Sequence, residues 1–129
     1  MRKVVDLAVI ENRRILLVKK NLAWLLPGGK PMSGESDEDC LERELSQKLS
    51  GTKFDHNSLR FYGTFEGLSP HKKDVIKVDV YSAKLQGVTG KPSGEISDSV
   101  WLGAEKFGEY LLSEATSKVV KSLCKDGYL

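Results

Sequence analysis

The sequence has little of what marks secreted, membrane-spanning or metal-clustering proteins. Only two of its 129 residues are cysteine, and Cys40 and Cys124 show neither a metal-ligand spacing nor a disulfide framework. No apolar run approaches the length needed to cross a membrane, and the first residues carry no secretory cleavage pattern. We therefore expect a cytoplasmic protein without a membrane segment, whose two thiols stay reduced.

A strong excess of charge of either sign is also missing. The formal net charge is +2, and lysine and arginine are spread along the chain rather than clustered. General nucleic-acid binding needs a concentrated basic surface, so this function is not expected. Local basic loops can still contact the phosphates of a small molecule.

The chain does have the composition of an ordinary folded domain. With 40% hydrophobic and 29% charged residues it can bury one core, so we expect a single domain over residues 1–129. Aliphatic runs predict strands, and the first two runs, separated only by Glu-Asn-Arg, suit a hairpin. The predicted strands cover residues 3–10, 14–20, 59–67 and 75–85, and the predicted helices cover residues 36–49 and 113–127.

The first predicted helix is amphipathic and carries a capping sequence. Ser36 can cap its N-terminus, and Asp39 can complete a capping box. Leu41, Leu45 and Leu49 recur every four residues, which places them in one apolar stripe. We expect this stripe to pack against a sheet.

A glycine pair ahead of this helix indicates a ligand-binding turn. Gly28 and Gly29 tolerate unusual backbone dihedral angles and the close approach of a ligand. The helix that follows directs three polar side chains to one side, away from the leucine stripe. These are Glu44, Gln47 and Lys48.

This stretch resembles the signature of the Nudix hydrolases, in which glycine is followed after five residues by glutamate, and after seven more by Arg-Glu and an aliphatic residue. Gly29, Glu35, Arg43, Glu44 and Leu45 stand at those intervals. The order of strands and helices also fits, so the resemblance covers nearly the entire chain. It implies an α/β/α sandwich around a mixed β-sheet, with Glu35 and Arg43 bracing the loop on the helix. It also implies a pyrophosphohydrolase acting on a nucleoside diphosphate linked to another group.

Two acidic positions of that signature are replaced. Gln47 and Lys48 stand where the family has a glutamate pair that helps to hold divalent cations, commonly Mg²⁺. Such cations prefer carboxylate oxygens, and they neutralise phosphoryl charge as water attacks. Gln47 offers a neutral oxygen, whereas the Lys48 ammonium repels the ion. We therefore expect Mg²⁺ or Mn²⁺ to bind weakly, through Glu44, Gln47 and, from a later loop, Glu95.

Residues in later loops supply further candidates. By resemblance, Glu95 can be a metal ligand or the general base, which makes it a candidate catalytic residue beside Glu44; a solvated loop acid is the equal alternative. Lys72 and Lys73 in Ser-Pro-His-Lys-Lys-Asp can reach substrate phosphates, although a solvated basic loop explains them as well. Selectivity would be determined by loops 68–74 and 86–94, which carry no signature of a particular substrate.

Lys48 has two interpretations. In the structural one, Glu44 and Lys48 form an i,i+4 ion pair worth roughly a few tenths of a kcal/mol if exposed. In the functional one, Lys48 takes the place of a metal and contacts a substrate diphosphate beside Gly28 and Gly29. A lysine used in this way supplies binding more readily than catalysis, because it does not acidify water.

Three functions remain open. The first is a weakly active Nudix-type pyrophosphohydrolase using Glu44 and Glu95, favoured because nearly all proteins with this scaffold are hydrolases. The second is a catalytically silent nucleotide-binding or sensor protein of the same fold, favoured by Gln47 and Lys48. The third is a structural or partner-binding module, disfavoured by the intact glycine turn.

Overall fold

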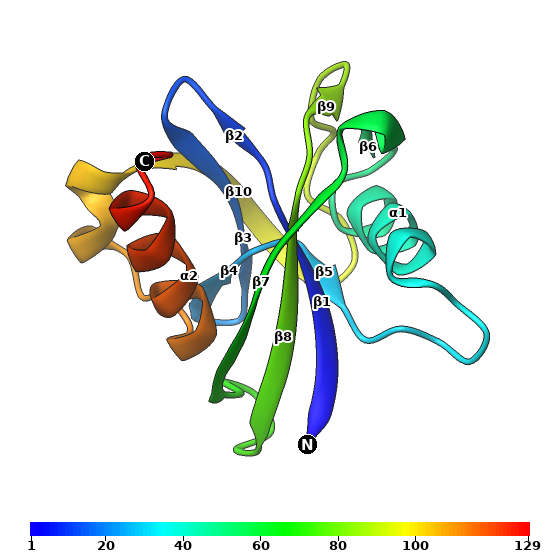
Figure 1. Ribbon diagram of the computed structural model, residues 1–129, viewed down its shortest axis with the longest axis horizontal. Coiled ribbons are helices and arrows are strands. Elements are labelled where there is room, and N and C mark those ends of the chain that lie inside the picture. Colours follow the sequence, from blue (N-terminus) through cyan, green and yellow to red (C-terminus); the bar gives the residue numbers. More distant parts are fainter.

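The fold places two helices on opposite sides of twisted β-sheets, as Figure 1 shows. The computed structural model describes all 129 residues of the chain. The predicted α/β arrangement, with helices flanking mixed sheets, is confirmed. The elements are β1 Arg2–Ala8, β2 Ile10–Glu11, β3 Arg14–Lys20, β4 Ala23–Leu25, β5 Gly28–Gly29, α1 Asp37–Lys48, β6 Lys53–Phe54, η1 His56–Ser58, β7 Arg60–Leu68, β8 Val75–Ser82, β9 Leu85–Gln86, β10 Ile96–Gly103, η2 Ala104–Glu109 and α2 Glu114–Lys125.

The strands form two four-stranded sheets and a small ladder. The first sheet has the order β5-β1-β8-β7; β1 and β8 run parallel, with Val4 opposite Val78, and the other pairs are antiparallel. The second sheet is antiparallel, in the order β10-β3-β2, with β4 also paired to β3. β6 and β9 form a separate two-stranded ladder. The parallel pair β1 and β8 therefore lies at the centre of the mixed sheet.

The hairpin predicted from the first two aliphatic runs is wrong in one respect. The run 3–10 is divided at Val9, so that β1 stays in the first sheet while β2 pairs with β3 in the second. Val9 is fully buried, and its carbonyl accepts a hydrogen bond from the Leu16 N–H at 3.0 Å. Asn12 and Arg13, both with positive φ, close only the short β2–β3 hairpin. Aliphatic periodicity indicates strand but cannot show that one run serves two sheets.

Helix α1 begins and packs as predicted. The Ser36 hydroxyl accepts a hydrogen bond from the Asp39 N–H, and the Asp39 carboxylate accepts one from the Ser36 N–H. Leu41, Leu45 and Leu49 are each at most 1% exposed. They share a core cluster with residues of β1 and β3, which sets the rotation of the helix about its axis and turns its polar side toward β5.

Helix α2 covers the opposite side of the sheets (Figure 1). It begins at Ser113, whose hydroxyl accepts a hydrogen bond from the Thr116 N–H. Val119, Val120 and Leu123 form its apolar stripe, and they are buried in a cluster with residues of β3 and β8. Neither helix, at 12 residues each, has the length and apolarity that crossing a bilayer requires.

Both cysteines are free thiols, one in each helix. Cys40 is buried in α1 and donates a hydrogen bond to the Gly29 carbonyl, with sulfur and oxygen 3.6 Å apart, while Cys124 is half-buried in α2. Burial raises the pKa of the Cys40 thiol to about 11. At neutral pH this thiol therefore acts as a small packing residue rather than as a nucleophile.

The packing of α1 can be tested at the centre of its leucine stripe. Leu45→Ala removes a side chain that is 1% exposed, and we expect the free energy of unfolding to fall by about 2–5 kcal/mol in urea titrations. Leu22→Ala is the matched control, because Leu22 is 76% exposed and its removal should change that free energy by no more than about 0.5 kcal/mol. Equal losses in the two variants would contradict the packing described for α1.

Candidate functional site

The loop before α1 is fixed to the helix by an ion pair. Arg43 donates from Nε to Glu35 Oε2 at 2.8 Å and from Nη2 to Oε1 at 2.9 Å. The Met32 N–H adds a hydrogen bond to Oε1 at 2.9 Å. These contacts lower the pKa of the Glu35 carboxyl to about 2, and the hydrogen bonds from Arg43 have the largest effect. The bracing predicted for Glu35 and Arg43 is therefore confirmed.

The two glycines let β1, β5 and α1 approach one another closely. A Cβ at Gly28 would lie 2.1 Å from the Val5 carbonyl oxygen, and one at Gly29 would lie 2.4 Å from the Glu44 carboxyl carbon. Neither glycine has a positive φ. Glycine is thus required here for close approach and not for an unusual backbone conformation.

Two cationic side chains engage the Glu44 carboxylate. Arg43 Nη1 donates to Oε1 at 2.8 Å, and Lys48 Nζ lies 3.3 Å from Oε2. Lys48 Nζ also donates to the Gly28 carbonyl. The Glu44 and Lys48 side chains are only 14% and 15% exposed, so this is not the solvent-exposed helix pair of the structural interpretation. The Gly28 carbonyl accepts one of the three ammonium N–H groups, so N–H groups remain on Lys48 for a ligand.

Asp6 of β1 lies beside this ammonium. Its residue is 9% exposed, and its Oδ1 lies 2.3 Å from the position that a Cβ on Gly28 would take. Burial raises the pKa of the Asp6 carboxyl to about 7, against the opposing charge of Lys48 and with a smaller contribution from the charge of Glu44. The carboxyl is therefore about half protonated at neutral pH.

These groups line the inner end of a cleft of about 250 Å³. Alternate residues of β1 face it, so Arg2, Val4 and Asp6 follow one another along its length. Ile76 and Val78 of the adjacent strand β8 contribute apolar surface. Five cationic side chains face three carboxylates, which favours an anionic ligand. The charged lining residues are Arg2, Lys20, Lys30, Lys48, Lys72, Asp6, Glu44 and Glu95.

Glu95 forms part of the rim of the cleft. It precedes β10 and forms an ion pair with Lys20 at the end of β3, with Nζ and Oε2 3.0 Å apart. The hydrogen bond with Lys20 lowers the pKa of Glu95, and the charges of Lys48 and His71 lower it by smaller amounts. The Glu95 side chain is 68% exposed. The same rim includes His71, whose Nε2 lies 3.3 Å from the Lys20 carbonyl oxygen.

The structure brings most of the sequence-derived candidates together. Those that line the cleft are Gly28, Gly29, Glu44, Lys48, Lys72 and Glu95. Gln47 and Lys73 are exposed and do not line it. The sequence reasoning missed Arg2, Asp6, Lys20 and Lys30 as lining residues. For Arg2 and Asp6 a signal was present, since the alternation of Arg-Lys-Val-Val-Asp places both on the face of Val4.

The carboxylates at the cleft do not fit a magnesium or manganese ion. Both oxygens of Glu44 are in contact with a cation, and Glu95 is paired with Lys20. Gln47 lies outside the cleft, and no three His, Cys, Asp or Glu side chains are grouped to hold a metal ion. Divalent cations of this kind need several oxygen ligands free of competing positive charge. A site through Glu44, Glu95 and Gln47 would need a different arrangement of all three.

Comparison with known proteins places the chain among Nudix domains. Residues 1–123 match the family model described as NUDIX domain. No curated protein matches the sequence.

Several solved structures share the fold. A NUDIX hydrolase from Nitrosomonas europaea superposes with a TM-score of 0.79 at 13% identity, over 97% of this chain and 89% of that one. A MutT NUDIX hydrolase from Burkholderia pseudomallei superposes with a TM-score of 0.75 at 21% identity, over 93% of this chain and 95% of that one. The NUDIX domain of Shewanella oneidensis NrtR, solved with ADP ribose, superposes with a TM-score of 0.76 at 17% identity, over 98% of this chain and 88% of that one. At these identities the structures establish a common fold.

Asp6 should make stability depend on pH. Because its folded pKa of about 7 exceeds the ordinary value of 3.8, the unfolded chain loses this proton first, and stability falls as pH rises between those values. Asp6→Asn should remove that fall, which amounts to at most about 4 kcal/mol, in urea titrations at pH 4.5 and pH 8. The exposed carboxylate of Asp98 provides the control, since Asp98→Asn should retain the wild-type dependence. If the free energy of unfolding of the wild type instead rose between pH 4.5 and pH 8, the Asp6 carboxyl would not have the raised pKa described here.

Proposed function

This chain belongs to the Nudix family, and we propose that it binds a nucleoside diphosphate linked to another group through its own lysines rather than through a metal ion. The observation that carries the proposal is the position of Lys48. Its ammonium lies between the Glu44 carboxylate and the Gly28 carbonyl at the inner end of the cleft. A divalent cation on Glu44 would meet this fixed positive charge at close range.

The cleft can bind a diphosphate without a metal. Lys48 keeps N–H donors beyond the one that the Gly28 carbonyl accepts, and Lys30 and Lys72 line the same cleft without forming an ion pair in the chain. Lysine binds phosphate as a point charge, and a partly enclosed cationic cleft strengthens that attraction. The Asp6 carboxyl opposes binding only to the extent that it is ionised.

The fold comparison is consistent with this ligand class. The NrtR domain that superposes on 98% of this chain was solved with ADP ribose, which is a nucleoside diphosphate linked to a second sugar. The shared fold supports a cleft of suitable shape, whereas the choice of ligand must come from the side chains. Here five of those side chains are cationic, and Val4, Ile76 and Val78 are apolar.

Weak diphosphate hydrolysis is the second candidate. Membership of a family that typically consists of diphosphate hydrolases and the presence of Glu44 in the cleft favour it. It requires a cation to displace Lys48 from Glu44 and Lys20 from Glu95, and each displacement costs an existing ion pair. A partner-binding module, the third candidate, would leave a cleft rich in cationic side chains without a use.

Calorimetry with nucleoside diphosphate sugars, ADP ribose among them, tests metal-independent binding. In EDTA we expect wild-type protein to bind, and Lys48→Gln to bind about ten-fold or more weakly, because a charge-assisted hydrogen bond is lost. Lys121→Gln, an exposed lysine of α2 outside the cleft, is the matched control and should bind like wild type. Binding and turnover that appear only with Mg²⁺ would establish the hydrolase, and absence of both would favour the partner-binding module.

Restoring the family's glutamates tests the account of the metal site. Gln47→Glu combined with Lys48→Glu removes the competing ammonium and adds carboxylate oxygens, so Mg²⁺ affinity by calorimetry should rise well above that of wild type. Lys48→Glu alone should produce most of the gain, because Gln47 does not line the cleft. Gln47→Glu alone is the control and should add little. Tight Mg²⁺ binding by wild type would show that Lys48 does not exclude the ion.

A further inference from the structure

We propose that Arg2, oriented by Asp74, selects the group at the outer end of the cleft, and that this group is an uncharged ring with two neighbouring hydrogen-bond acceptors. The inference rests on the proposed binding function, since it concerns the part of the same ligand that lies farthest from its diphosphate. It assigns a specificity-determining role to one residue of β1 and a positioning role to one residue of the β7–β8 connection.

The Arg2 guanidinium is held along one side only. Nε donates to Asp74 Oδ2 and Nη2 donates to Oδ1, both at 3.1 Å. Guanidinium has five N–H donors in a planar fork, and this pairing uses two of them. Nη1 makes no hydrogen bond within the chain, and Nη2 keeps a second hydrogen. Arg2 therefore presents two adjacent donors from a side chain that lines the cleft.

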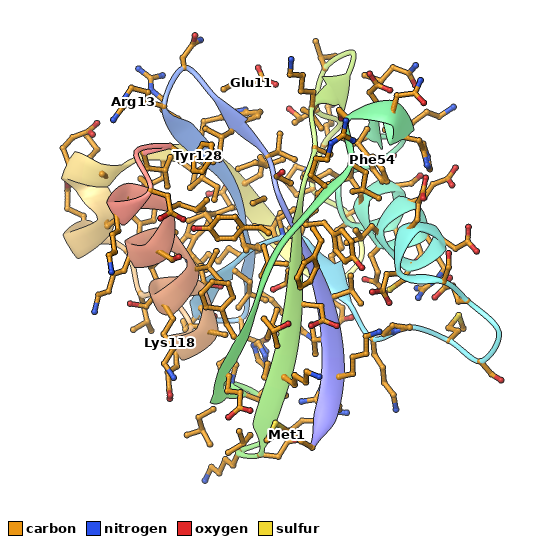
Figure 2. The ribbon with its side chains drawn as sticks, in the orientation of Figure 1. Met1, Glu11, Arg13, Phe54, Lys118 and Tyr128 are labelled. Atoms are coloured by element: carbon orange, nitrogen blue, oxygen red, sulfur yellow. The ribbon has the colours of Figure 1, made fainter.

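The backbone around the pair fixes where this fork lies. Arg2 begins β1 and stands opposite Ile76 of β8. The β7–β8 connection is closed by a hydrogen bond from the Ser69 N–H to the Asp74 carbonyl at 2.7 Å. Figure 2 shows Met1 beside this connection, at the end of the sheet where β1 starts. The Arg2–Asp74 pair thus ties the start of β1 to the loop that forms the outer rim.

The cations at the two ends of the cleft are held differently. At the outer end Asp74 balances the charge of Arg2, with Lys72 on the same connection, whereas at the inner end Lys48 is paired with Glu44 and lies beside Asp6. The proposed function places the diphosphate at Lys48, so the part of the ligand beyond it reaches Arg2, whose paired guanidinium suits an uncharged acceptor. At about 3.3 Å per strand residue, Arg2 and Asp6 are about 13 Å apart along β1. Val4 between the two ends and Ile76 beside Arg2 provide apolar surface for a flat ring.

Of the two common purines, guanine has the paired acceptors and adenine does not. Guanine presents N7 and O6 side by side, which arginine contacts with two hydrogen bonds, whereas adenine presents the N7 acceptor beside an N6 donor. An adenine in the same place would bring its amino group against the Arg2 donors. The geometry therefore predicts that guanosine diphosphates bind more tightly than adenosine diphosphates.

The test is calorimetry of GDP, IDP and ADP with the full chain in EDTA. IDP carries the same two acceptors as GDP without the 2-amino group, so both should bind about ten-fold or more tightly than ADP. Arg2→Lys retains the positive charge without the fork, and it should bring the affinity ratio of GDP to ADP toward one. Asp74→Ala should lower the same ratio, because Arg2 loses its orientation.

Two further variants separate this role from a general one. Lys3→Ala removes a neighbouring charge on the opposite face of β1, where Lys3 pairs with Asp37 at 2.7 Å, and it should keep the wild-type ratio. Lys48→Gln should weaken all three nucleotides equally. A wild-type ratio near one, or a ratio unchanged in Arg2→Lys, would overturn the role of Arg2 while leaving the proposed function intact. Failure of wild type to bind any of the three would overturn both.

Discussion

The contact of the Lys48 ammonium with the Gly28 carbonyl and the Glu44 carboxylate is the interaction on which the proposed binding function depends. It depends on two features of the fold. The leucine stripe of α1 sets the rotation of the helix, and the absence of a side chain at Gly29 lets Glu44 come against β5. In a site of this kind a metal ion would be an exchangeable source of positive charge. Under the proposed function the covalently attached Lys48 ammonium takes that role, so the inner end of the cleft holds a positive charge that does not come from solvent.

The alternation of β1 extends this difference along the whole cleft. Its three cleft-facing residues differ in character: Asp6 lies beside Lys48, Val4 is apolar, and Arg2 is neutralised by Asp74. If the diphosphate lies at Lys48 as proposed, a ligand with a charged end and a flat, uncharged end would therefore bind in one direction. The register of β1 with β8 continues the pattern, because Val78 stands opposite Val4 and Ile76 opposite Arg2. Two parallel strands thus supply both the floor of the cleft and its polarity.

Local features of the fold could be predicted from the sequence, and longer-range ones could not. The capping box at Ser36 and the leucine stripe of α1 depend on near neighbours in the chain, and both were predicted correctly. The division of the first strand at Val9 depends on which sheet each half joins, which periodicity does not encode. The site shows the same limit. Helical spacing placed Glu44 and Lys48 together, but it also placed Gln47 with them, and that side chain lies outside the cleft. The Arg2–Asp74 pair joins residues 72 positions apart and left no local signal.

The parts of the signature that this chain retains have structural roles that do not require hydrolysis. Glu35 and Arg43 hold the loop on α1, and Gly29 makes room for Glu44. Each would be needed by any protein that keeps this loop and helix in place, whether or not it binds a metal. The replaced positions are those whose role in the signature is to ligate the cation, and one of them now carries the opposite charge. An ammonium at that place can bind phosphate oxygens, but it does not lower the pKa of a water molecule. A metal ion promotes hydrolysis by lowering that pKa. The retained residues therefore account for the shape of the cleft, and the ammonium of Lys48 is the reason that we propose binding rather than catalysis.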